Sequence, residues 1–257
     1  MVDIYQEILA IKARGEDAAL VTIISASGST PRETGAKMLV RADGSIVGTI
    51  GGGNLELMAT KEAVKAIQTG KSKRIEHKLT PEGDTGMICG GDTELFIEPL
   101  LSQPNLYICG GGHIGLALDK IGRFLGYKIT VIEDRPEYAS AERFPEAVKI
   151  VVASYRDSFT KLNVDRSGYI VIVTHGHKGD EDALAGALNT GARYIGMIGS
   201  KKKNESVYSR LREKGFTNEQ LSKVHAPIGI EIYGQTPEEI AISIIAEIIS
   251  VRKGPAK

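Results

Sequence analysis

The first hundred residues combine short apolar runs with two stretches of helical periodicity. Four runs rich in apolar and β-branched residues have the length of strands, at residues 19–25, 36–41, 45–50 and 93–99. Apolar residues recur at helical spacing up to about Ala13 and again over residues 54–69. This half of the chain is therefore predicted to be a small mixed α/β domain.

The rest of the chain alternates regularly between strand-like and helix-like segments. Strands are predicted at residues 106–109, 128–132, 149–152, 169–174 and 194–198. Helices are predicted at residues 114–124, 180–189 and 237–251, the last with Thr236 as N-cap and Pro237 at its first position. Such alternation is typical of a parallel, doubly wound sheet, so we expect a Rossmann-like α/β domain.

The two patterns meet at residues 99–105, P-L-L-S-Q-P-N, which contain two prolines and show no periodicity. We place the domain boundary near Ser102, giving domains of residues 1–102 and 103–257. The first carries 11 basic and 14 acidic residues and the second 21 and 18. The two halves are therefore weakly complementary in charge.

Charge and cysteine usage narrow the class of protein. Thirty-two basic residues balance 32 acidic ones, so no overall field favours nucleic acid or an anionic membrane as partner. Two cysteines, Cys89 and Cys109, are too few for a disulfide scaffold and suggest a reducing compartment. The start of the chain lacks the positive charge of a signal peptide, and no apolar run reaches the roughly 18 residues of a membrane span. We expect a soluble cytoplasmic protein.

Glycine is enriched, at 30 of 257 residues, and its clusters directly follow apolar runs. In L-Y-I-C-G-G-G-H-I-G, the spacing of Gly110, Gly112 and Gly115 matches the dinucleotide fingerprint between a strand and a helix. The next strand ends at Glu133 and Asp134, where an acid holds a ribose 2′-hydroxyl and disfavours a 2′-phosphate. NAD is thus favoured over NADP, unless the turn serves only the fold.

Two later segments also follow predicted strands. In T-H-G-H-K-G-D-E-D, His175 or His177 is a candidate proton donor beside a nicotinamide, which would make the protein an NAD-dependent oxidoreductase. The same histidines with Asp180 and Asp182 resemble a metal-binding run. The alternative is a purely structural role, in which Gly179-Asp180 forms the N-cap of the next helix. Ser200 and Lys201 lie at the start of a predicted helix that is rich in lysine. This helix start either binds a phosphate or is a solvated basic surface.

The first half has three loops of small or reactive residues, each after an apolar strand. Residues 28–32 end in Arg32, whose guanidinium with backbone donors would cradle an anion. Residues 51–53 open the helix that contains Glu56, and a helix N-terminus is suited to a phosphate. Cys89, before two glycines, is either a thiolate able to ligate a soft metal or a small buried hydrophobe. Cys109 is assigned to the core.

These motifs together resemble the XdhC/CoxI family over essentially the whole chain. In the first half the resemblance is carried by G-S-T-P-R-E-T-G-A-K-M, G-T-I-G-G-G-N-L-E and M-I-C-G-G. In the second it is carried by C-G-G-G-H-I-G, V-I-E-D-R-P, T-H-G-H-K-G-D-E-D-A-L, Y-I-G-M-I-G-S-K-K-K and H-A-P-I-G-I-E-I-Y-G-Q-T-P-E-E-I-A. Gly115 stands where many relatives have alanine and Glu133 where aspartate is commoner, and neither change removes the turn or the acid.

The resemblance implies an accessory factor, a non-catalytic chaperone that binds the molybdenum cofactor and assists its sulfuration and insertion into a molybdenum hydroxylase such as xanthine dehydrogenase. Its expected partners are the hydroxylase apoenzyme and a cysteine desulfurase or sulfurtransferase, and we expect a homodimer. By this analogy Cys89 contacts molybdenum or the incoming sulfur. NAD-dependent oxidoreduction and dinucleotide sensing remain as alternatives.

Candidate cofactor-binding residues in the first half are Arg32, Gly51, Gly52, Gly53, Cys89, Gly90 and Gly91, with Cys89 as the metal ligand. Those in the second half are Gly110, Gly112, His113, Gly115, Glu133, Asp134, His175, Ser200 and Lys201.

Overall fold

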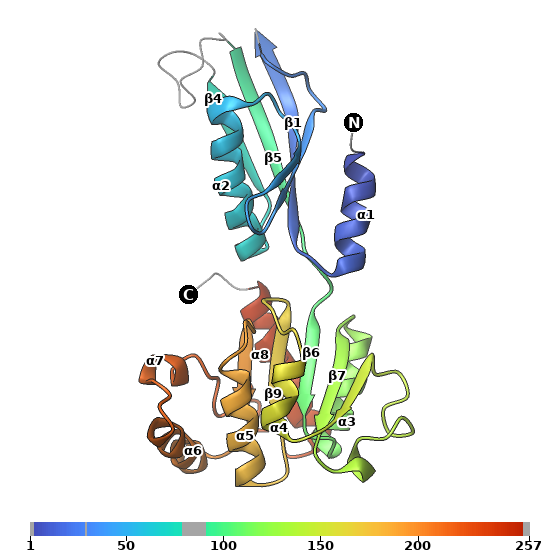
Figure 1. Ribbon diagram of the computed structural model, residues 1–257, viewed down its shortest axis with the longest axis vertical. Helices are drawn as coiled ribbons and strands as arrows, with labels where there is room; N and C mark the ends of the chain where they lie inside the picture. The colour runs from blue at the N-terminus through green and yellow to red at the C-terminus, as the bar shows by residue number, and fades with distance from the viewer. Residues whose placement is uncertain (1–2, 29, 79–90, 254–257) are drawn as a thin grey trace. The chain divides into compact units, whose positions relative to one another are not determined.

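The computed structural model describes residues 3–28, 30–78 and 91–253 (Figure 1). The chain divides between Ser102 and Gln103 into two compact units. Each unit has its own sheet and core, and both are α/β, as the sequence predicts. No helix in the described part of the chain is long and apolar enough to cross a membrane.

Unit 1 is an antiparallel sheet with a helix on each face. Its elements are α1 (Ile4–Arg14), β1 (Ala18–Gly28), β2 (Lys37–Arg41), β3 (Ile46–Gly48), α2 (Gly53–Thr69), β4 (Lys73–Lys78) and β5 (Gly91–Leu100). The strand order is β3-β2-β1-β5-β4. Met38 and Val40 pack in the core with α2, whereas Leu39 between them packs with Ile11 of α1. The period of two along β2 therefore places the helices on opposite faces.

Strand β4 is the one element of unit 1 that the sequence pattern did not predict. It reads K-R-I-E-H-K, and its alternate residues Lys73, Ile75 and His77 lie on the side of the sheet that carries α2. Its pairing with β5, with Ile75 opposite Leu95, holds it in place. Neighbouring strands rather than its own composition thus make this charged segment a strand.

Unit 2 is a parallel five-stranded sheet with helices on both faces. Its strands are β6 (Asn105–Cys109), β7 (Lys128–Glu133), β8 (Lys149–Val152), β9 (Gly168–Ile172) and β10 (Tyr194–Met197). Its helices are α3 (His113–Phe124), α4 (Tyr155–Ser158), α5 (His177–Ala187), α6 (Lys201–Glu213), α7 (Asn218–Leu221) and α8 (Pro237–Lys253), with two short 3-10 turns, η1 (Pro136–Tyr138) and η2 (Phe159–Lys161). The order β10-β9-β6-β7-β8 makes this a doubly wound sheet.

The strand order of unit 2 determines where a ligand would bind. The chain runs from β6 outward to β7 and β8, and then returns to β9 on the other side of β6. The connections after β6 and β9 therefore leave in opposite directions, which creates a topological switch point between these strands. In open α/β sheets, ligands bind at the carboxyl ends of the strands at such a point.

Helix α8 has the predicted cap, α6 has a side-chain cap at the helix start predicted at Ser200, and α5 departs from the prediction. Ser200 caps α6 by accepting from Lys203 N, and Thr236 and Glu239 bond each other's backbone N–H at the start of α8. Helix α5, however, begins at His177 rather than near Asp180. Asp180 is not its N-cap, because its buried carboxylate accepts from Thr174 inside the first turn.

Candidate functional site

Two of the three predicted loops of unit 1 meet at one end of its sheet, together with Gly91, the last residue of the third. Gly28, the last residue of β1, pairs with Gly91, the first residue of β5. Gly51 has φ +128°, and a Cβ there would lie 2.5 Å from Cγ of Pro31. The loop that carries Arg32, the loop at residues 51–53 and the first residue of β5 are therefore neighbours, and the Arg32 side chain is exposed.

The glycine loop at residues 51–53 already holds an anion, the carboxylate of Glu56. Its Oε1 accepts from Ile50 N at 3.0 Å, from Gly52 N at 2.9 Å and from the Thr49 hydroxyl at 2.5 Å. Although burial raises the pKa of Glu56, these hydrogen bonds lower it below its ordinary value. This corrects the expectation that the whole loop is open to a phosphate, since Gly52 N donates to Glu56 and Gly51 N donates to the Thr49 hydroxyl.

We expect Glu56→Ala to lower the free energy of unfolding by about 2 kcal/mol, because it leaves partly buried amides without an acceptor. Urea unfolding of the full chain, followed by circular dichroism, measures the change. Glu33→Ala is the matched control, since Glu33 is exposed and its loss is expected to change stability by less than about 0.5 kcal/mol. Equal effects of the two changes would contradict the structural role of Glu56.

The remaining predictions in unit 1 concern Cys89 and its neighbours. Cys89, predicted as the metal ligand, and Gly90 lie outside the described residues. Gly91 begins β5, two positions after Cys89. Within residues 3–28, 30–78 and 91–253, no three His, Cys, Asp or Glu side chains form a metal site. Cys109 belongs to the core as predicted, and burial raises the pKa of its thiol, so it stays protonated.

In unit 2, each glycine of the fingerprint is explained by a different feature of the structure around it. A Cβ on Gly110, whose φ is +120°, would lie 2.3 Å from the carbonyl oxygen of Val173. A Cβ on Gly115 would lie 2.1 Å from the carbonyl oxygen of Gly110. Gly112, by contrast, has no heavy atom within 4 Å of that position, and no side chain caps α3, whose first residue is His113. The helix N-terminus at the switch point is thus open to a ligand.

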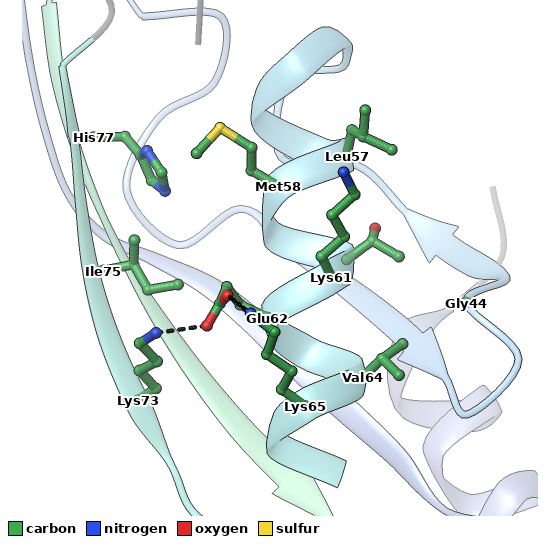
Figure 2. Close-up of a pocket in the computed structure, with 11 residues that line it drawn as sticks. Gly44, Leu57, Met58, Lys61, Glu62, Val64, Lys65, Lys73, Ile75 and His77 are labelled. Atoms are coloured by element: carbon green, nitrogen blue, oxygen red, sulfur yellow. Dashed lines mark hydrogen bonds and ion pairs between the residues drawn. The ribbon is translucent and has the colours of Figure 1, made fainter. Parts of the chain in front are cut away.

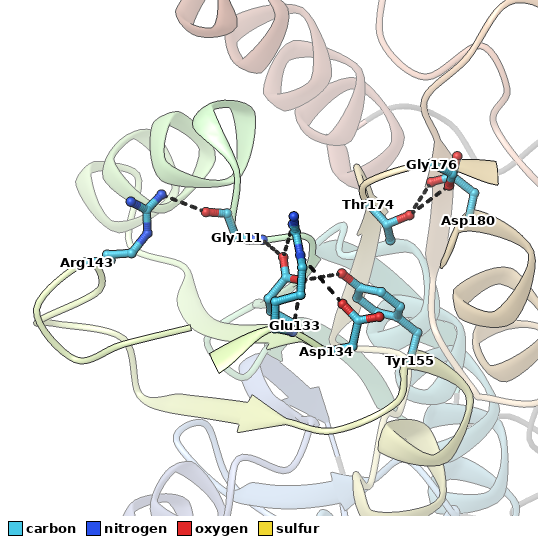
Figure 3. A network of polar contacts seen from close by, with 9 residues as sticks. Gly111, Glu133, Asp134, Arg143, Tyr155, Thr174, Gly176 and Asp180 are labelled. Carbon is cyan, nitrogen blue, oxygen red and sulfur yellow. Dashed lines mark hydrogen bonds and ion pairs between the residues drawn. The ribbon is translucent and has the colours of Figure 1, made fainter. Parts of the chain in front are cut away.

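The carboxylate of Glu133 is hydrogen-bonded to other residues of unit 2 (Figure 3). Its fully buried carboxylate accepts from Gly111 N at 2.8 Å, from Arg135 Nε at 2.9 Å and from the Tyr155 hydroxyl at 3.0 Å. Burial alone would raise the pKa of Glu133, but the hydrogen bonds from Arg135 and Gly111 lower it to about 2. The expectation that Glu133 holds a ribose is thus replaced by a role in fixing the glycine turn.

Asp134 is the acid at this strand end that faces outward. Its side chain is 50% exposed. Burial and the neighbouring charge of Glu133 raise the pKa of Asp134. Of the two acids predicted to contact a ribose, Asp134 is the one whose carboxylate is accessible.

We expect stability to fall as the pH falls from about 4.5 to about 2, because the folded pKa of Glu133 lies below its ordinary value of 4.5. The stabilisation from ionised Glu133 is complete above pH 4.5 and is lost as the group is protonated. The share of Glu133 is on the order of 3 kcal/mol. Urea unfolding across this pH range measures the slope, and an unchanged midpoint would contradict the assignment.

In the segment after β9, Asp180 of the predicted metal-binding run forms an ion pair, whereas the side chain of His177 lies outside the described residues. The Thr174 hydroxyl donates to Asp180 Oδ1 at 2.7 Å, and Lys203 Nζ lies 2.6 Å from Oδ2 of the same carboxylate. Asp180 is fully buried, whereas His175 is exposed. Lys203 therefore neutralises the buried charge of Asp180. Lys201 is exposed and follows Ser200, the N-cap of α6.

The contacts of several residues in this region could not be predicted from the sequence. Tyr155 lies 22 residues from Glu133, and Lys203 lies 23 residues from Asp180. Arg143 donates to the Gly111 carbonyl at 3.0 Å, and its guanidinium stacks over Tyr138. Arg135 is the exception, because an arginine directly after two acids is a local sign of an ion pair.

The chain matches two families. Residues 106–248 match the XdhC Rossmann domain, and residues 11–78 match the XdhC and CoxI family. The two matches have the order that the motif resemblance predicts, and the first covers more than half of the chain.

Three curated proteins are similar in sequence. The uncharacterized protein YqeB of Escherichia coli is 34% identical over 97% of this chain and 46% of its own length. A Bacillus subtilis protein, a probable xanthine dehydrogenase subunit, is 27% identical over 63% and 47%. The molybdenum cofactor insertion chaperone PaoD of Escherichia coli is 26% identical over 93% and 84%. The chain thus spans about half the length of the first two relatives and most of the third.

One solved structure has the same fold over nearly the whole chain. A crystal structure from Bacillus halodurans, described as a xanthine dehydrogenase, superposes with a TM-score of 0.55 and 22% identity. The similarity covers 98% of this chain and 96% of that one. It therefore supports the two-unit α/β fold.

Proposed function

Because this chain belongs to the XdhC and CoxI family, we propose that it is an accessory factor that carries the molybdenum cofactor to a molybdenum hydroxylase such as xanthine dehydrogenase. The observation that carries the proposal is the meeting of the Arg32 loop, the loop at residues 51–53 and the start of β5 at one end of the sheet. The similarity to a cofactor insertion chaperone over 93% of the chain supports it.

The chemistry of this sheet end suits such a cargo. The molybdenum cofactor is a phosphorylated, sulfur-rich anion, and the exposed guanidinium of Arg32 is suited to a phosphate because it donates two parallel hydrogen bonds. Since Glu56 occupies part of the glycine loop, we place the phosphate on Arg32 rather than on those amides. Cys89 is proposed to contact the molybdenum or the incoming sulfur, as a soft thiolate ligand.

The test is anaerobic incubation of the purified full chain with free molybdenum cofactor, gel filtration, and assay of the protein peak for molybdenum and pterin fluorescence. We expect co-elution with the wild type and a loss of about tenfold or more in affinity with Cys89→Ala or Arg32→Ala. Cys109→Ala and Lys12→Ala are the controls, and they are expected to bind like the wild type. Absence of co-elution with the wild type would overturn the proposal.

The finer parts of this function concern sulfuration and assembly. We propose that a cysteine desulfurase or sulfurtransferase delivers sulfur to the bound cofactor, that the hydroxylase apoenzyme receives it, and that the chain acts as a cytoplasmic homodimer. Sedimentation equilibrium of the purified chain tests the dimer. Hydroxylase activity in cells that express Cys89→Ala tests the delivery, and full activity would contradict a role for this thiol.

Dinucleotide binding to unit 2 is a second candidate, either for NAD-dependent oxidoreduction or for sensing. It is favoured by the open N-terminus of α3 at Gly112 and by the accessible carboxylate of Asp134. NAD, if bound, would supply hydride transfer, and this chain would hold its pyrophosphate at Gly112 and its ribose at Asp134. A thermal shift with NAD that is lost in Gly112→Ala would support this candidate, and no shift with NAD or NADP would exclude it.

A further inference from the structure

The basic residues of the first hundred are concentrated in one segment. Residues 61–78 carry six of the 11 basic residues found before residue 103 and only two of the 14 acidic ones. The segment covers most of α2 and all of β4. A basic segment therefore lies within a unit whose other charged residues are mainly acidic. Such segregation creates a local field for a charged partner.

This basic segment borders a groove with a volume of about 810 Å³ that extends from β4 across α2 to Gly44, in the turn between β2 and β3 (Figure 2). Its apolar lining comes from two elements and consists of Leu57, Met58, Val64 and Ile75. Three lysines lie along it, Lys61, Lys65 and Lys73, and the buried His77 lines its end on β4. The groove thus combines an aliphatic floor with a cationic rim.

The charges at the rim are only partly neutralised. Glu62 pairs with Lys65 at 2.7 Å and with Lys73 at 2.5 Å, so one carboxylate serves two ammonium groups. Lys61 makes no ion pair with a described residue. Leu57, one helical turn before Lys61, is 55% exposed. An apolar side chain and an unneutralised cation therefore stand side by side on α2.

Strand β4 also lies at the edge of the sheet formed by the described residues. Lysines on an edge strand commonly serve to prevent unwanted strand pairing. That purpose accounts for Lys73, but it accounts neither for Lys61 on the neighbouring helix nor for the exposed Leu57. The groove as a whole is better explained by a partner with both acidic and aliphatic side chains.

We propose that this groove along α2 and β4 is a docking site for an acidic, extended segment of another protein. In such a segment the carboxylates would meet the lysines of the rim, and alternate aliphatic side chains would cover the floor as the segment runs along β4. A single-stranded nucleic acid is the less favoured partner, because its bases stack on aromatic side chains and the groove lining has no Trp, Tyr or Phe. The site is separate from the Arg32 loop, and its role does not depend on the cofactor.

The test uses a fluorescein-labelled peptide that alternates glutamate with leucine, and fluorescence anisotropy with the full chain. The patch variant combines Leu57→Ser with Lys61→Glu. The matched control combines Leu9→Ser with Lys12→Glu on α1, where Leu9 is 68% exposed. Thermal unfolding of both variants shows that they are folded. Comparison probes are a glutamate-glycine peptide and an oligothymidine.

We expect the wild type to bind the glutamate-leucine peptide, the patch variant to bind it roughly tenfold more weakly or worse, and the control within about twofold of the wild type. Raising the salt concentration is expected to weaken binding. The glutamate-glycine peptide is expected to bind more weakly, since it cannot cover the aliphatic floor. Failure of the wild type to bind, equal losses in both variants, or tighter binding of the oligothymidine would each overturn the proposal.

Discussion

Replacing Gly110 with alanine is expected to lower the free energy of unfolding of the chain by about 4 kcal/mol or to prevent folding of unit 2. The new Cβ would lie 2.3 Å from the carbonyl oxygen of Val173, a backbone atom that cannot move aside cheaply, and the φ of +120° is unfavourable for alanine. The contact joins the turn after β6 to the turn after β9, so its disruption separates the strands at the switch point. Urea unfolding measures the loss.

Gly112→Ala is the control two positions away. Its φ is −72°, and nothing lies within 4 Å of the added Cβ, so we expect a change in stability of less than about 1 kcal/mol. If the two variants were equally stable, the close approach to Val173 would not be the reason for a glycine at position 110. If both were severely destabilised, the loop would be tighter than the structure shows.

Replacing Glu133 with glutamine is expected to cost about 3 kcal/mol of stability at neutral pH. Glutamine keeps the size of the side chain but loses the charge that Arg135 pairs with, and its amide group would face the donors Gly111 N and the Tyr155 hydroxyl. The glycine turn would lose its main anchor. Urea unfolding at pH 7 measures the loss, and the acid-dependent loss of stability between about pH 4.5 and 2 is expected to be smaller in the variant.

Two further variants serve as controls for Glu133→Gln: one removes a neighbouring charge, and the other removes a single hydrogen bond to Glu133. Asp134→Asn removes an adjacent, half-exposed carboxylate and is expected to change stability by less than about 1 kcal/mol. Tyr155→Phe removes one of the hydrogen bonds to Glu133 and is expected to cost about 1 kcal/mol. Similar losses in Glu133→Gln and Asp134→Asn would mean that burial and pairing of Glu133 are not what stabilises the turn.

The sequence predicted those features of the fold that depend on neighbouring residues. Strands β6, β9 and β10 are buried on both faces, so each appears as a mainly apolar run, such as G-Y-I-V-I in β9. The cap at Thr236 was predictable because a cap acts within three residues. The glycine fingerprint was predictable for the same reason, and in the structure Gly110 has a positive φ at the turn and Gly115 packs closely against the Gly110 carbonyl.

The partners of the candidate site residues were not predictable in this way. Nothing near Glu133 in the sequence indicates that Tyr155 donates to it, and the strand β4 owes its conformation to pairing with β5 rather than to its own charged composition. The helix N-terminus at residues 51–53 looked open to a phosphate, but the side chain of Glu56 folds back onto it. The sequence suggested that Asp180 is a helix cap or a metal ligand, whereas in the structure its carboxylate pairs with Lys203.

The sequence by itself therefore determined the two-unit α/β architecture, the family resemblance and which loops carry reactive residues. Only the tertiary structure decided that Gly28 meets Gly91 and that Pro31 meets Gly51, and which carboxylates are already paired. The physical reason is one of range. Periodicity and capping act over a few neighbouring residues, whereas the ionisation and accessibility of a buried carboxylate depend on groups that the fold brings from far along the chain.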